Sequence, residues 1–115
     1  MAKIGLYGGG FKPPTRGHFE VVHKIINEYT DLDMLIVLVG KGIRNGISQG
    51  ESILIWDLYI KYLPLKVRII PVSSPVGEIY SLSKDNLEDE FIWFLGERQG
   101  KEEDVKDIEI RTKHL

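Results

Sequence analysis

The chain has 115 residues, which suits one domain over residues 1–115 built around one hydrophobic core. Hydrophobic residues make up 43% of it and charged residues 28%, so it carries enough apolar material for a packed interior, and a disordered chain is excluded. Fifteen Lys and Arg residues against 17 Asp and Glu residues give a net charge of −2, so we expect neither nucleic acid nor a membrane as a partner.

The N-terminal residues and the apolar runs favour a cytoplasmic protein. Met34–Val39 is the longest uninterrupted apolar run, far short of the roughly 20 residues that cross a bilayer. The first residues lead directly into a strand pattern and do not resemble a signal peptide. The chain contains no cysteine, so disulfides, thiolate catalysis and cysteine metal sites are excluded.

The first predicted strand is Lys3–Tyr7, and a glycine-rich loop over residues 8–18 follows it. The loop leads into a helix, since apolar residues there recur at the i, i+3, i+4, i+7 spacing of one helix face. These residues are Phe19, Val22, Ile25, Ile26 and Tyr29. Met34–Val39 is continuously apolar, as expected of a strand that is covered on both faces.

A second helix is predicted to begin at a capping box formed by Ser48 and Glu51 and to end before Pro64. Its apolar residues surround the helix axis, so one face packed on a sheet cannot hide them all. Leftover apolar surface of this kind is typical of an interface, and we therefore expect a homo-oligomer. The alternative is that the C-terminal tail covers this surface.

The third strand is predicted over Lys66–Val72 and the fourth over Phe91–Leu95. Between them, Ser74 is the predicted N-cap of a helix that runs from Pro75 to about Leu82. The charge-rich tail, residues 97–115, is expected to be a helix or a weakly ordered end. Alternating strands and helices predict an α/β fold with a Rossmann-like, doubly wound parallel sheet. In such sheets ligands bind beyond the carboxyl ends of the strands.

The loop after the first strand reads Gly8-Gly-Gly-Phe-Lys-Pro-Pro-Thr-Arg-Gly-His18. Successive glycines let backbone amides approach a phosphate closely, and the helix N-terminus that follows favours an anion. The dinucleotide motif Gly-x-Gly-x-x-Gly fails because Pro13 replaces the third glycine, and the chain contains no Gly-Lys-Ser/Thr for a P-loop. A dinucleotide oxidoreductase is therefore disfavoured.

The loop resembles that of the nucleotidyltransferase superfamily, which reads Gly-x-Phe-x-Pro-x-(His/Thr)-x-Gly-His. Residues 9–18 match all six fixed positions. The resemblance implies the α/β/α sandwich of the cytidylyltransferase-like (HUP-type) fold. It also implies transfer of AMP or CMP from ATP or CTP to a small phosphorylated acceptor, with release of pyrophosphate and with Mg²⁺ bound to the phosphates.

The resemblance also implies roles for the loop residues. His18 would donate to the α-phosphate in the transition state, Thr15 would hydrogen-bond a phosphate oxygen, and Gly17 would leave room for the nucleotide. Lys12 replaces the acidic or amide residue common at its position and adds a cation near the phosphates. Backbone donors to the phosphates would come from Gly8, Gly9, Gly10 and Phe11.

Further cations follow the other strands. Lys41 and Arg44 stand in a glycine-containing loop after the second strand, where they could neutralise phosphate charge. Arg98 follows the fourth strand and is a candidate ligand residue. No residue is singled out as a metal ligand.

One part of the family pattern is missing. The family's second signature, approximately Ile-Ser-x-Thr-x-x-Arg at the start of a C-terminal helix, has no counterpart in this chain. Either the chain is a truncated form, or another element binds the triphosphate tail. The alternative to an enzyme is therefore a non-catalytic nucleotide-binding module of the same fold. The choice of base and the identity of the acceptor stay open.

Overall fold

The computed structural model describes residues 1–98 and 108–115 of the chain. Its five strands form one sheet in the order β3-β2-β1-β4-β5, with β1 at the centre. Strands β1 to β4 are parallel to their neighbours, and β5 is antiparallel to β4. The strands are β1 (Lys3–Gly9), β2 (Met34–Gly40), β3 (Val67–Val72), β4 (Glu90–Arg98) and β5 (Ile108–His114).

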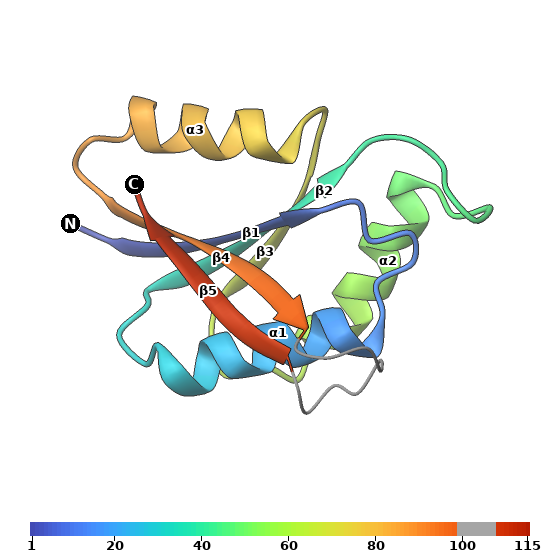
Figure 1. Ribbon diagram of the computed structural model, residues 1–115, viewed down its shortest axis with the longest axis horizontal. Coiled ribbons are helices and arrows are strands. Elements are labelled where there is room, and N and C mark those ends of the chain that lie inside the picture. Colours follow the sequence, from blue (N-terminus) through green and yellow to red (C-terminus); the bar gives the residue numbers. More distant parts are fainter. Residues whose placement is uncertain (99–107) are drawn as a thin grey trace.

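Three helices cover the two faces of this sheet (Figure 1). Helices α1 (Arg16–Glu28) and α2 (Gln49–Ile60) pack on one face, where Val22 and Trp56 belong to the larger apolar cluster. Helix α3 (Pro75–Asp85) packs on the other face through Ile79. The molecule is thus a three-layer α/β protein whose mostly parallel sheet is compatible with a Rossmann-like fold.

The predicted helix starts are confirmed in atomic detail. Ser48 Oγ accepts a hydrogen bond from Glu51 N at 3.1 Å, and Glu51 Oε1 accepts one from Ser48 N at 3.2 Å. Ser74 Oγ accepts from Gly77 N at 3.2 Å, with Pro75 at the first helical position. These caps satisfy amides that have no partner within the helix, and they fix where each helix leaves the sheet.

Strands β1, β2 and β4 run further than the sequence predicted, β2 by Gly40 alone, and the structure of the tail differs from both expectations for it. Strand β1 continues through Gly8 and Gly9, because these residues still pair with Leu38 and Val39 of β2. Strand β4 continues to Arg98 because residues 108–114 form β5 and pair with it. The expectation of a helix or a weakly ordered end was wrong for residues 108–114, and the sheet is not wholly parallel. Residues 99–107 lie outside the described part.

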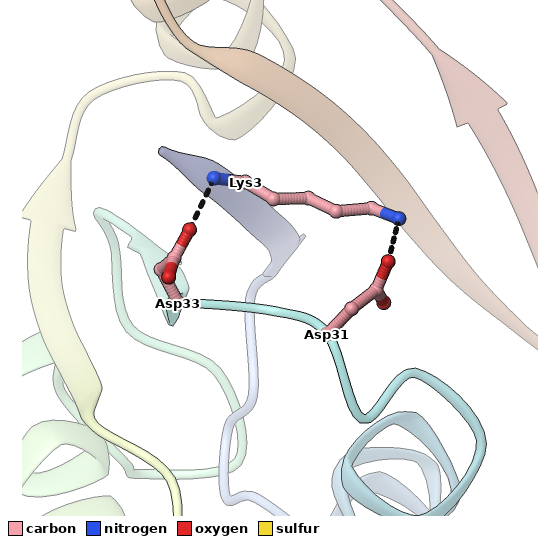
Figure 2. Close-up of polar contacts among 3 residues, drawn as sticks. All are labelled: Lys3, Asp31 and Asp33. Carbon is pink, nitrogen blue, oxygen red and sulfur yellow. Dashed lines mark hydrogen bonds and ion pairs between the residues drawn. The ribbon is translucent and has the colours of Figure 1, made fainter. Parts of the chain in front are cut away.

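At the amino ends of the strands, the turn between α1 and β2 is fastened to the start of β1 (Figure 2). The Lys3 amide donates to Asp33 Oδ2 at 2.7 Å, and the Lys3 ammonium forms an ion pair with Asp31. This pair raises the pKa of Lys3 and lowers the pKa of Asp31. Among the described residues no helix has the length and apolar character needed to cross a bilayer.

Candidate functional site

The loop after β1 turns back onto the core through Phe11. This residue has a positive φ of 51°, a left-handed conformation that a bulky side chain rarely adopts. Its ring is buried and lies 5.1 Å from the Trp56 ring and 4.9 Å from the His18 ring, measured between centroids. A Cβ on Gly9 would lie 2.9 Å from Phe11 Cζ, so glycine is needed where this ring folds back. Phe11 therefore anchors the loop by its side chain.

Thr15 and His18 stand at the N-terminus of α1, where the helix dipole favours an anion. The Thr15 amide donates to His18 Nδ1 at 2.8 Å. Because Nδ1 accepts this hydrogen bond, the proton of the neutral ring is carried by Nε2. The capping interaction thus selects the histidine tautomer that is protonated at Nε2.

Lys12 connects the loop after β1 to the end of β2. Its ammonium donates to Gly10 O at 2.6 Å and to Gly40 O at 2.7 Å, and the residue is only 8% exposed. Two of its three N–H donors are therefore directed at backbone carbonyls. Burial, and secondarily the guanidinium of Arg44, lower the pKa of Lys12.

A small hairpin in the loop after β2 faces Lys12. Arg44 and Ile47 exchange backbone hydrogen bonds of 3.1 and 2.9 Å around Asn45 and Gly46, whose φ angles are 54° and 72°. Two central residues with positive φ define a type I′ turn, for which Asn-Gly is the preferred sequence. Asn45 Nδ2 donates to Lys12 O at 3.0 Å. Lys12 thus donates to the end of β2, and Asn45 donates back to the loop after β1. These hydrogen bonds hold Arg44 beside the first loop.

These loops enclose a cavity of about 480 Å³ at the carboxyl ends of β1 and β4. The strand that follows β1 in the chain, β2, lies on one side of this pair, and the strand that follows β4, β5, lies on the other, which makes this the switch point where open α/β sheets bind ligands. Figure 1 shows the loops after β1 and β2 at the same end of the sheet. The cavity is lined by Tyr7, Gly8, Gly9, Gly10, Phe11, Lys12, Pro13, Thr15, His18, Arg44, Asn45, Leu95 and Gly96.

An adjoining cavity of about 330 Å³ lies between the first loop and residues 41–44, and Gly10, Lys12 and Arg44 line both. Lys41 lines only this second cavity and is exposed. No Asp or Glu side chain occurs among the described residues that line either cavity, so both present a cationic surface. The site can therefore hold a multiply charged anion.

Most of the predicted site residues come together here. Gly17 is an exception, because it is buried in the first turn of α1 and does not line the cavity. Arg98 ends β4, and its side chain lies outside the described part of the structure. Burial raises the pKa of Tyr7, which lines the cavity floor and stays a neutral phenol.

Two positioning residues were not predicted. Asn45 could have been found from the Asn-Gly pair, which is a strong turn signal on its own. Gln49, the first residue of α2, donates to Val39 O at 2.8 Å and to Val72 O at 3.1 Å, which ties together the ends of β2 and β3. Nothing in the local sequence distinguishes Gln49 from an ordinary exposed helix residue.

No family model matches the chain, and no curated protein matches it. Among the described residues, no group of three or more His, Cys, Asp or Glu side chains is placed to hold a metal ion. The function of the site must therefore be inferred from the loop sequence and from the geometry of the cavity.

Proposed function

We propose that the protein is a nucleotidyltransferase that moves AMP or CMP from ATP or CTP to a small phosphorylated acceptor. The observation that carries the proposal is the cavity at the switch point, where Thr15 and His18 at the N-terminus of α1 face a cationic loop pair. Its volume of about 480 Å³ is within the range of small-molecule sites. A nucleotidyltransferase with this loop would have the cytidylyltransferase-like (HUP-type) fold.

In the proposed reaction, an oxygen of the acceptor phosphate attacks the α-phosphorus of the nucleoside triphosphate in line. The bond between the α-phosphorus and its bridging oxygen breaks, and pyrophosphate leaves with the electron pair. No covalent intermediate with the protein forms. Because charge spreads over the phosphate oxygens in the transition state, positioning and electrostatic stabilisation supply the rate enhancement.

The residues at the start of α1 would supply this stabilisation. His18 would donate from Nε2 to an α-phosphate oxygen, and the Thr15 hydroxyl would bind a neighbouring phosphate oxygen. Arg44 would hold the triphosphate from the opposite loop, where a guanidinium offers two parallel N–H donors. Lys41, in the adjoining cavity, would bind a further phosphate of the nucleotide or the acceptor.

Magnesium would enter with the nucleotide. Mg²⁺ prefers carboxylate, phosphate and water oxygens, and the described lining of the cavity offers no carboxylate. The residues present therefore do not fit a protein-held Mg²⁺ site, and the ion would be carried by the phosphates of the substrate.

Calorimetric titration of the protein with ATP and then with CTP, each with Mg²⁺, tests the proposal. We expect saturable binding of one nucleotide, and loss of this binding in Thr15→Ala. An assay of pyrophosphate release with candidate phosphorylated acceptors then tests for turnover. In that assay His18→Ala should lower turnover by about 10²-fold or more, as expected for the loss of one transition-state donor.

His23→Ala is the matched control, because His23 lies on the same helix, is exposed and does not line the cavity. It should bind and turn over like the parent protein. Binding without turnover for every acceptor would identify a nucleotide-binding module. If neither nucleotide binds, the proposed function is wrong.

A further inference from the structure

The outward face of α2 carries an uncovered apolar stripe. Leu54 and Leu58 lie one turn apart on α2 and are 64% and 63% exposed, and Tyr62, in the turn that follows the helix, is 87% exposed. The opposite face of the helix buries Ser52 and Trp56 against the core. Large apolar side chains at this spacing on one exposed helix face are typical of an interface with another helix.

The charges along this stripe have opposite signs at its two ends. Glu51 lies in the first turn of α2, Lys61 directly follows the last turn, and both are exposed. If a second α2 packs antiparallel on the stripe, each Glu51 lies near the partner copy's Lys61 at both ends. A parallel pair would instead bring like charges together. Antiparallel helices also place opposite dipole ends side by side.

The neighbouring edge of the sheet is poorly suited to association. Strand β3 is an edge strand of the sheet, and α2 packs beside it. Its residue Pro71, which is in register with Val39 of β2, has no amide to donate to another strand. Arg68, exposed on the same strand, adds a charge that opposes strand pairing. Association on this side of the molecule is therefore expected through α2 rather than through the edge of β3.

We propose that the protein forms a two-fold symmetric homodimer in which two copies of α2 pack antiparallel through Leu54, Leu58 and Tyr62. A symmetric interface requires a surface that complements itself, with residue i meeting residue j and j meeting i. The apolar stripe with Glu51 at one end and Lys61 at the other meets this requirement. The proposal does not depend on nucleotide binding.

Sedimentation velocity over a range of protein concentrations tests the proposal. We expect a reversible monomer–dimer equilibrium, and only monomer for Leu58→Asp at concentrations where the parent protein is dimeric. Circular dichroism and thermal melting should show that Leu58→Asp is folded, as expected for an exposed position, and Leu54→Asp provides a second variant. Leu87→Asp is the matched control, because Leu87 is 86% exposed but follows α3, and it should leave the dimer intact.

Charge exchange tests the orientation. Lys61→Glu alone should weaken association by at least about tenfold, since it places like charges together at both ends of the interface. The double variant Glu51→Lys with Lys61→Glu should restore it. A parent protein that is monomeric at all concentrations overturns the proposal, and so does a dimer that Leu58→Asp leaves intact. A double variant that stays as weak as Lys61→Glu overturns the antiparallel arrangement.

Discussion

Lys12 and Lys41 both lie near the cavity, but Lys12 has a structural role because it is buried, whereas Lys41 contributes an exposed charge. The Lys12 ammonium is buried between two backbone carbonyls, whereas Lys41 is exposed on the next loop. Removing a buried donor leaves its acceptors unpaired away from water, which is costly. Removing an exposed cation leaves the fold unaffected and lowers only the positive charge that the surface offers to an anionic ligand.

We therefore expect Lys12→Met to lower the free energy of unfolding by about 2 kcal/mol, and Lys41→Met to change it by less than about 0.5 kcal/mol. Urea unfolding followed by circular dichroism measures both. Nucleotide affinity should fall in both variants, through a displaced loop in the first and a lost charge in the second. Equal stabilities of the two variants would contradict the positioning role of Lys12.

The ion pair between Lys3 and Asp31 predicts a pH dependence. It lowers the pKa of Asp31 below that of the unfolded chain, so it stabilises the fold above the unfolded pKa. This stabilisation is lost as pH falls through the lowered pKa of the folded state. Melting temperatures of the parent and of Asp31→Asn should therefore differ slightly at neutral pH and converge in acid. A difference that grows as pH falls would contradict the assignment.

At the scale of elements, the short hairpin at residues 44–47 positions part of the site. It contributes no side chain to the main core clusters, yet its turn places Arg44 beside the cavity and Asn45 against the first loop. Its geometry depends on Gly46, whose positive φ is unfavourable for residues with a Cβ. A change here should affect binding more than folding.

Gly46→Val should lower stability by about 1 kcal/mol and weaken nucleotide binding more than this loss implies, because the turn opens and Arg44 moves away. Calorimetric titration and urea unfolding measure the two effects. Gly50→Ala is the matched control: Gly50 lies in α2 with no contact that a Cβ would violate, so alanine should stabilise the protein by about 0.5–1 kcal/mol and leave binding unchanged. Unchanged binding in Gly46→Val would exclude a positioning role for the hairpin.

At the scale of the whole molecule, the cavity belongs to several parts of the chain at once. Residues after β1, after β2 and at the end of β4 line it, so a ligand there contacts three segments that separate on unfolding. A ligand that binds only the folded protein stabilises it in proportion to the logarithm of its concentration. Nucleotide binding should therefore be visible in thermal unfolding.

At a concentration 100 times its Kd, the preferred nucleotide with Mg²⁺ should stabilise the fold by about 2.7 kcal/mol and raise Tm by about 10 °C. Differential scanning calorimetry measures this shift. Adenosine and cytidine, which lack phosphates, should produce little shift, because the lining is cationic and its predicted contacts are with phosphates. If the nucleosides stabilise the fold as much as the nucleotides, the loop does not bind phosphate.

Elements with local signals were predicted well from the sequence. The caps at Ser48 and Ser74 and the apolar runs of the first four strands determine their structure through neighbouring residues. Strand β5 was not predicted, although apolar Ile108 and Ile110 alternate with charged Glu109 and Arg111, because so short an alternation specifies a strand only when a neighbouring strand, here β4, pairs with it. Its existence depends on tertiary pairing.

The same distinction holds for the candidate site. The loop motif predicted Thr15 and His18 at a helix start, and both line the cavity. The sequence did not predict that Lys12 is buried or that Phe11 packs into the core. Both depend on where the ends of β2 and α2 lie in three dimensions, and no local pattern in the first loop encodes those positions.

The position of β1 between β2 and β4 has a consequence for the synthesis of the protein. Lys3 pairs with Glu90, so the centre of the sheet joins the beginning of the chain to residues made much later. Such distant pairing is slow to form, because a long loop must close before any contact compensates the lost entropy. On the ribosome, β1, α1 and β2 can assemble early, but the wall of the cavity at Leu95 and Gly96 comes only with β4. A growing chain therefore gains its binding site only after most of its residues have left the ribosome.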